Sequence, residues 1–268
     1  MGQINLTFTT KDIDPKDHTL SVLIEMDSLV YGVFDKQNNL VASGNHAINI
    51  YSKDPFSALI EDGNINLDYN KTSVTYSTAD FVHLSELDFG GGDFDAYFNN
   101  ISIGDEILSN RFTDSGIYAV FPVNSNLRSN LNALINPTLE IHISTAMRQY
   151  IYPSQAKKNV VLVGMGRIHY MSYNRGDLIM YNAYTYRTKE DFLYYLQLAT
   201  EFTSMDREID VLEMAGWLGV NSDIYKFVAP YYRHLKWVSL PEMTILSSDE
   251  NHLKHYYFAL YASALCVS

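Results

Sequence analysis

Apolar and polar positions follow the same order twice along the chain. Residues 22–35 (VLIEMDSLVYGVFD) align without gaps on residues 161–174 (VLVGMGRIHYMSYN), and residues 39–48 match residues 177–186 in pattern. Each copy has an apolar strand, a tight turn, an alternating strand, a polar turn and a third strand, because strand side chains alternate between two faces. The repeat therefore predicts two antiparallel three-stranded meanders.

Turn and helix signals support this interpretation in both copies. The polar turns at 37–39 and 174–177 carry Asn or Gly, which tolerate positive φ, so hairpins are expected there. Behind the first meander, Asp54 and Pro55 predict the start of a helix that ends at Gly63. Behind the second meander, Thr188 and Asp191 have the spacing of a capping box, which predicts another helix.

Strand-like and helix-like segments alternate through the rest of the chain, which predicts α/β layers. The expected strands and helices are 117–123, 126–135, 138–143, 209–214, 222–229, 234–240 and about 248–265. Residues 151–159 contain a proline and paired lysines and are the expected boundary between the lobes. We therefore expect a first lobe at 1–152 and a second lobe at 153–268.

Composition narrows the classes of function. The chain has 268 residues, of which 47% are hydrophobic, and this is enough to bury two cores. Its net charge of -12 argues against nucleic acid as a partner, because phosphate backbones are bound by Lys and Arg. We expect no transmembrane segment and a cytoplasmic location, since no long apolar run or signal-peptide pattern occurs. The single cysteine, Cys266, permits no intramolecular disulfide.

The duplicated pattern resembles the actin, hexokinase and Hsp70 superfamily. More specifically, the chain is similar to a Bacteroidetes family, domain of unknown function 3822, which has an actin-like ATPase (ribonuclease H-like) fold. The segments that carry the resemblance are LSVLIEMDSLVYGVFD at 20–35, the stretch 159–199 and HYYFALYASALCV at 255–267. The resemblance implies an α/β protein of two duplicated lobes, with a buried C-terminal helix that packs on the second lobe.

In nucleotide-binding members of this superfamily, the first hairpin turn of each half is a phosphate loop with an Asp-x-Gly core. The resemblance places Glu25 and Asp27 in the first turn, where Asp27 replaces the glycine and would repel phosphate. It places Gly164 and Gly166 in the second turn, where the glycine is kept and the acid is lost. A glycine against the adenosine is expected near Gly216, which is followed by a bulky tryptophan.

These departures favour a catalytically inert pseudo-ATPase, a binding or scaffold module that has a protein partner and no cofactor. A homodimer contact is one form that such a partner could take. The alternative is an ATPase or small-molecule kinase that binds ATP and Mg²⁺, with Glu25 and Asp27 in one open cleft. A third interpretation, polymerisation like that of actin, is not tested by sequence.

Each of the other candidate motifs lacks residues that its chemistry would require. The glycine-rich segment 90–95 lacks the lysine and Ser/Thr of a phosphate loop, so we expect a flexible loop. Its neighbouring aspartates lack EF-hand spacing (Asp88, Asp93 and Asp95). A metal would need further ligands beyond His252 and His255, which are expected to be exposed helix residues. No base lies near Cys266 in sequence, so a nucleophilic role is not expected.

Overall fold

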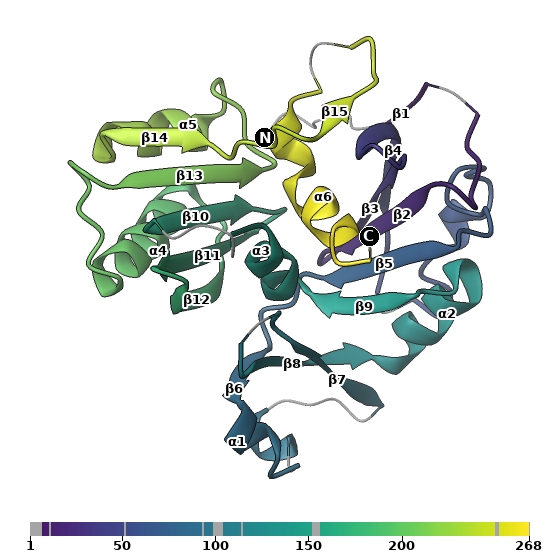
Figure 1. The fold of residues 1–268 in the computed structure, drawn as a ribbon, viewed down its shortest axis with the longest axis horizontal. Coiled ribbons are helices and arrows are strands. Elements are labelled where there is room, and N and C mark those ends of the chain that lie inside the picture. Colours follow the sequence, from purple (N-terminus) through teal and green to yellow (C-terminus); the bar gives the residue numbers. More distant parts are fainter. Residues whose placement is uncertain are drawn as a thin grey trace.

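A computed structural model describes residues 7–10, 12–50, 52–92, 94–98, 104–113, 115–151, 156–249 and 252–267. The chain forms two large sheets, each with helices packed against it, and a third, small sheet (Figure 1). The first large sheet has the order β1-β4-β3-β2-β5-β9, with β15 also paired to β4. Its strands are β1 (Phe8–Thr9), β2 (Thr19–Ile24), β3 (Ser28–Phe34), β4 (Asn39–Ala47), β5 (Lys71–Tyr76), β9 (Leu139–His142) and β15 (Thr244–Ile245).

The second large sheet repeats the core of the first. Its order is β12-β11-β10-β13-β14, which matches β4-β3-β2-β5-β9 strand for strand. In both sheets the first three strands are antiparallel and the last two join in parallel. The strands are β10 (Lys158–Val163), β11 (Arg167–Asn174), β12 (Asp177–Thr185), β13 (Val211–Gly216) and β14 (His234–Trp237). The two predicted meanders and the α/β class are therefore confirmed.

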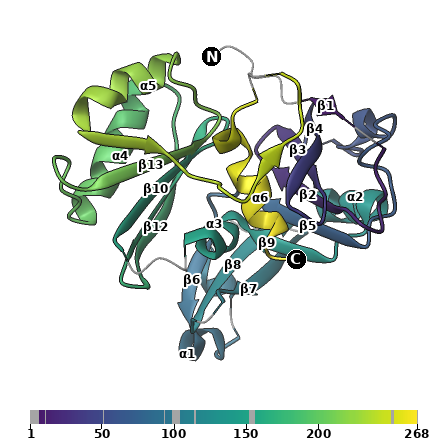
Figure 2. The ribbon, with the colours of Figure 1, turned by 45° about the horizontal axis from the view of Figure 1, so that its top comes forward.

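The third sheet has the order β6-β8-β7 and lies between β5 and β9 in the chain. Its strands are β6 (Val82–Ser85), β7 (Asp105–Arg111) and β8 (Ile117–Asn124), and the short helix α1 (Glu86–Phe89) follows β6. Figure 2 shows this sheet projecting below the two larger ones. Sequence patterns predicted β8 but not the sheet to which it belongs.

The helices cover the faces of the large sheets. They are α2 (Ser125–Ile135), α3 (Ile143–Ile151), α4 (Lys189–Phe202), α5 (Asp223–Val228) and α6 (Phe258–Ala264), with short 3-10 turns at Ser57–Leu59, Asp95–Tyr97, Ala229–Tyr231 and Lys254–Tyr257. The predicted capping box starts α4: the Thr188 hydroxyl accepts from the backbone N–H of Asp191, and the Asp191 carboxylate accepts from that of Thr188. No helix of the described residues has the length and apolar character needed to cross a membrane.

The C-terminal helix α6 is buried, as predicted, but the predicted position on the second lobe is wrong. It lies mainly on β2, β3 and β5 of the first sheet and against α3, with a smaller contact to β13 of the second sheet (Figure 1). The hydroxyl of Ser21 on β2 donates to the carbonyl of Leu260 at 2.8 Å, and that of Thr75 on β5 donates to Ser263 at 2.6 Å. Buried hydroxyls on the first sheet thus find their partners on α6, which fixes the helix there.

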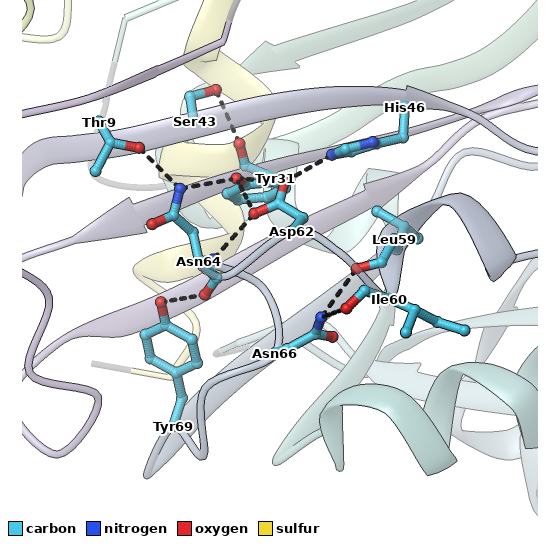
Figure 3. Close-up of polar contacts among 10 residues, drawn as sticks. All are labelled: Thr9, Tyr31, Ser43, His46, Leu59, Ile60, Asp62, Asn64, Asn66 and Tyr69. Atoms are coloured by element: carbon cyan, nitrogen blue, oxygen red, sulfur yellow. Dashed lines mark hydrogen bonds and ion pairs between the residues drawn. The ribbon is translucent and has the colours of Figure 1, made fainter.

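The helix predicted after Pro55 is also wrong, because only the 3-10 turn Ser57–Leu59 forms. The side-chain amide of Asn66 donates to the carbonyls of Leu59 and Ile60 at 2.9 and 2.8 Å. A side chain that takes up these carbonyls competes with the helical hydrogen bonds they would otherwise accept. The segment is therefore a loop that its own asparagine holds in place (Figure 3).

Asp62 attaches the same loop to the outer face of the first sheet. Its carboxylate accepts from the hydroxyl of Tyr31 at 2.8 Å and from the backbone N–H of Asn64 at 2.9 Å, and it pairs with His46 Nε2 at 2.8 Å (Figure 3). Burial and the neighbouring carboxylate raise the pKa of Tyr31. The phenol therefore stays protonated and donates to Asp62.

The boundary predicted between the lobes lies partly outside the described residues, because 152–155 are not among them. The division into 1–152 and 153–268 stays a prediction. Two elements from the second range, β15 and α6, nevertheless lie on the first sheet. The sheets are also joined by one apolar core, which includes Leu23 and Phe34 of the first sheet and Leu162 and Met171 of the second.

Candidate functional site

The two hairpin turns paired by the sequence repeat are closed by the same backbone hydrogen bond, although Asp27 lacks the positive φ of the aligned Gly166. In the first turn, the N–H of Glu25 donates to the carbonyl of Ser28 at 2.9 Å, and in the second, that of Gly164 donates to Arg167 at 2.8 Å. Gly166 has a φ of +73°, a conformation that suits glycine. The carboxyl ends of β2, β5, β10 and β13 all lead to these turns or their neighbours, so side chains from both lobes meet here.

Glu25 reaches from the first turn into the second. The backbone N–H of Met165 donates to its carboxylate. A Cβ added to Gly164 would overlap the Oε1 atom of Glu25, so the absence of a side chain at Gly164 makes room for this carboxylate. Only 6% of Glu25 is exposed to solvent. The space beside Gly164 in the second turn is thus filled by the carboxylate of the first.

Burial dominates the electrostatics of Glu25. Removal from water raises the pKa of its carboxyl group to about 7, although the N–H of Met165 and the charge of Arg167 act in the opposite direction. The negative charge of Asp27 adds to the increase. The Oε2 atom is buried and has no hydrogen-bond partner in the described chain. Near neutral pH, Glu25 therefore exists as a mixture of its protonated and ionised forms.

Arg167 and His169 of the second lobe bind the segment that follows β5. The guanidinium of Arg167 donates to the carbonyl of Ser77, and Nε2 of His169 lies 2.8 Å from the Ser77 hydroxyl. The other ring nitrogen of His169 lies 2.8 Å from the hydroxyl of Tyr181. Burial lowers the pKa of Arg167. The two lobes are consequently joined by buried polar contacts on both sides of Glu25.

Two further histidines extend this contact to the small sheet. His142 Nδ1 and His83 Nε2 lie 2.7 and 3.0 Å from the hydroxyl of Ser144, and His142 Nε2 donates to the carbonyl of Thr78. Burial lowers the pKa of His142 to about 3 and that of His83 to about 4, and it lowers the pKa of His169 as well. These rings are therefore neutral at physiological pH and act as hydrogen-bonding parts of the core.

Asp27 lies in a different environment from Glu25. It is exposed, as are Met26 and Met165 at the tips of the two turns. A shared Mg²⁺ site would need both carboxylates to face one open space, and the burial of Glu25 contradicts that expectation. Within the described residues, no group of three or more His, Cys, Asp or Glu side chains has a metal-binding arrangement.

Gly216 has a structural reason to be glycine. Its φ is +88°, and an added Cβ would overlap the carbonyl oxygen of Val163 on the neighbouring strand β10. The next residue, Trp217, donates its backbone N–H to the same carbonyl at 2.8 Å. The packing of β13 on β10 thus explains this glycine without a ligand, whereas Glu25, Gly164 and Gly166 form the center of the candidate site.

Those residues of the remaining sequence motifs that the structure describes have structural roles. Asp88 accepts from the Ser85 hydroxyl at the start of α1, while Asp93 and the side chain of Asp95 lie outside the described residues. His252 and His255 were expected to be exposed, and this is wrong: only 4% of the His252 side chain is exposed, and His255 is buried, stacks on Trp237 and lies 2.8 Å from the carbonyl of Leu218. Burial raises the pKa of Cys266 to about 12, which leaves its thiol unreactive.

Sequence reasoning missed Arg167, His169 and Ser77. Arg167 had a detectable signal, because it directly follows the second turn, at the position that aligns with Ser28. The signal for His169 and Ser77 was weaker, since the contact between them joins residues 92 positions apart.

Comparison with known proteins supports the fold. The model of a family described as "Protein of unknown function (DUF3822)" matches residues 8–235, and none of the curated proteins matches the sequence. A Bacteroides thetaiotaomicron protein of unknown function with an actin-like ATPase fold is 16% identical, with a TM-score of 0.72, and the match covers 85% of this chain and 94% of that one. The chain therefore has the actin-like ATPase fold.

Two other solved structures belong to proteins of multicomponent systems. The PilM–PilN type IV pilus biogenesis complex contains a chain that is 12% identical, with a TM-score of 0.65 and coverage of 92% of this chain and 98% of that one. The cytoplasmic domain of EpsL, from the type II secretion system of Vibrio cholerae, is 12% identical, with a TM-score of 0.51 and coverage of 94% and 96%. At these identities the likeness shows the fold alone.

Proposed function

The chain belongs to the DUF3822 family of proteins of unknown function, and we propose that it is a non-catalytic actin-like module that acts by binding a protein. One observation carries this proposal: the carboxylate of Glu25 lies against Gly164 in the second turn, the turn that by resemblance to nucleotide-binding actin-like proteins would be a phosphate loop. The N–H of Met165, which such a loop would offer to an anion, already donates to Glu25. A side chain of the protein thus already takes up this N–H.

A nucleotide would have to overcome this arrangement. Like charges about 4 Å apart repel by roughly 1 to 4 kcal/mol between the dielectric constants of water and of a protein surface. Asp27, exposed in the first turn, adds a second negative charge near Glu25. Displacement of Glu25 would also break one of the contacts between the two lobes, its bond to the N–H of Met165. We therefore propose that the module works without ATP, Mg²⁺ or another cofactor.

The proposed protein partner is supported by the two structural neighbours from multicomponent systems, PilM and EpsL. Both share the fold over nearly the whole chain, and the EpsL structure is of a cytoplasmic domain. By analogy we propose a cytoplasmic location for this chain. An ATPase or kinase is the second candidate, but no observation at the turns favours it, since Glu25 is buried and Asp27 is exposed.

Thermal unfolding in a titration with Mg-ATP, with phosphate release followed in the same samples, tests the proposal. We expect no saturable rise in the midpoint at millimolar nucleotide and no phosphate release above the blank. Saturation at about 100 times Kd would add about 2.7 kcal/mol and raise the midpoint by roughly 5 to 10 °C for a chain of this size. Such a saturable rise in the wild type, or steady phosphate release, would overturn the proposal.

Two variants sharpen the same experiment. If the Glu25 carboxylate is what blocks the second turn, Glu25→Ala could gain a nucleotide-dependent rise that the wild type lacks. Asp17→Ala is the matched control, because Asp17 is an exposed acid before β2, at the opposite end of this strand from the turn. A rise in Glu25→Ala alone would assign the block to Glu25, whereas an equal rise in both variants would point to the overall charge.

A further inference from the structure

Corresponding edges of the two large sheets differ in what covers them. In the first sheet, the edge strand β4 pairs with β1 at Ala42 and Ser43 and with β15 at Asn39 and Leu40. The equivalent strand of the second sheet, β12, pairs with β11 on one side, and no strand of the described residues pairs with its other side. Figure 2 shows β12 at the border of its sheet. The second sheet therefore has an open edge where the first is closed.

The edge of β12 lacks the charged residues and prolines that often protect an edge from strand addition, although the Asn182 side chain accepts from the backbone N–H of Ala183 at 2.9 Å, a bond that strand pairing there would have to replace. Its residues from 178 to 184 are LIMYNAY, with no charge and no proline, and 46% of Ile179 is exposed. The ladder does skip Ile179 and thereby forms a bulge. β4 has the equivalent bulge at Val41, and each of its two added strands pairs on one side of that bulge only, so a strand added to β12 is expected to pair with residues 180–184, after the bulge.

An exposed apolar stripe of α4 lies next to this edge. Tyr195 of α4 stacks on Tyr184 of β12, with ring centroids 5.0 Å apart, so this side of the helix faces the edge strand. Leu198 and Phe202 follow Tyr195 by three and seven positions and hence lie on the same side of the helix. They are 45% and 72% exposed, and Tyr194 beside them is 61% exposed. We call β12 with Tyr194, Leu198 and Phe202 the β12–α4 surface.

We propose that the β12–α4 surface binds a second copy of this chain, with the two β12 strands paired antiparallel about a two-fold axis. An isologous contact must be self-complementary. Asp177 begins β12 and Arg187 lies two residues after its end, and both are exposed, so an antiparallel pair brings each acid toward the other copy's base. The stretch between them is uncharged, which matters for a chain of net charge -12, because most other surfaces would repel their own copies.

This pairing defines the center of the interface. If the two copies pair through residues 180–184, Asn182 is midway and lies opposite itself on the axis. Met180 and Tyr184, which pack toward α4, then face each other across the two copies. The two sheets become one continuous sheet, and the apolar stripes of the two α4 helices lie side by side over it. The proposed partner of each β12 strand is thus the β12 strand of the second copy.

Sedimentation velocity over a concentration series, from micromolar to hundreds of micromolar, tests this inference. We expect the wild-type mass to approach twice the 30.6 kDa of one chain. Asn182→Lys places like charges opposite each other on the axis, and Phe202→Glu adds charge to the apolar stripe, so each should weaken the dimer by at least about tenfold. Leu87→Glu is the matched control: Leu87 is exposed on α1, away from the surface, and its loss should leave the dimer intact.

A covalent trap locates the contact independently. In a Cys266→Ser background, Asn182→Cys should form an intermolecular disulfide under mild oxidation, because the two thiols would meet at the axis, whereas Leu87→Cys should not. Thermal unfolding of each variant confirms that it folds. A wild type that stays monomeric throughout the series, a dimer unaffected by both Asn182→Lys and Phe202→Glu, or equal trapping at both cysteines would overturn the inference. The test does not involve nucleotide and is independent of the proposed function.

Discussion

Glu25 and Gly164 form a matched pair across the two lobes. One contributes a buried carboxylate, and the other contributes the space that the carboxylate occupies. The alignment of the two turns predicted that these residues would be equivalent, but it did not predict that they would touch. Complementarity of this kind has a direct energetic consequence, because a side chain at position 164 competes with one at position 25.

We predict that Gly164→Ala destabilises the wild type by about 1 to 3 kcal/mol, the usual range for overpacking. In a Glu25→Ala background the same substitution should cost much less, since the overlapping carboxylate is gone. Chemical denaturation of the four proteins gives the coupling free energy. Gly63→Ala serves as control, because nothing lies within 4 Å of a Cβ there and the cost should be small in both backgrounds. Equal costs of Gly164→Ala with and without Glu25 would contradict the contact.

We also predict a pH-dependent penalty from Glu25. Its pKa is about 7 in the folded protein and 4.5 as a model value, so the folded state binds the extra proton between these pH values. Stability therefore falls as pH rises from 4.5 to 7, by at most about 3 kcal/mol, and is constant above that range. Glu25→Gln cannot ionise, so its unfolding free energy should rise relative to wild type over the same window. A difference that is flat from pH 4.5 to 8 would show that Glu25 is ionised in both states.

At the scale of elements, sequence patterns correctly predicted the hairpins and the start of α4, because both depend on interactions between neighbouring residues. The hairpins were predicted from alternating apolar and polar positions and from turn residues such as Asn38, Arg175 and Gly176, all of which have positive φ in the structure. The capping box of α4 needs only four neighbouring residues. The helix after Pro55 failed because the side chain of Asn66 takes up the carbonyls of Leu59 and Ile60, and propensity does not report that competition.

The position of each element relative to the others could not be predicted in this way. The contact between Ser21 and Leu260 spans 239 positions, and that between Arg167 and Ser77 spans 90. The histidines at the junction of the three sheets were not recognised for the same reason: each is an isolated residue on its own strand until the fold brings His83, His142 and His169 together. Their low pKa values are a property of that burial, and sequence spacing carries no trace of it.

At the scale of the whole molecule, the C-terminal helix makes the first lobe depend on the far end of the chain. The inner face of the first sheet carries the hydroxyls of Ser21, Ser73 and Thr75, which are completely buried. The Ser21 hydroxyl donates to the carbonyl of Leu260, and those of Ser73 and Thr75 pair with the Ser263 hydroxyl at 2.9 and 2.6 Å. Without α6, this face would expose its apolar core and lose the partners of its hydroxyls.

We therefore predict that residues 1–152 alone do not form a cooperative native state, even though they include the strands of the first lobe predicted from sequence. The same fragment with residues 252–268 joined through a flexible Gly/Ser linker should recover it, because α6 can then return to β2 and β5. Cooperative thermal unfolding and near-UV circular dichroism distinguish the two fragments. A fragment 1–152 that unfolds cooperatively without the helix would show that the first lobe is independent, and the role of α6 would then be to hold that lobe against the second through the core they share.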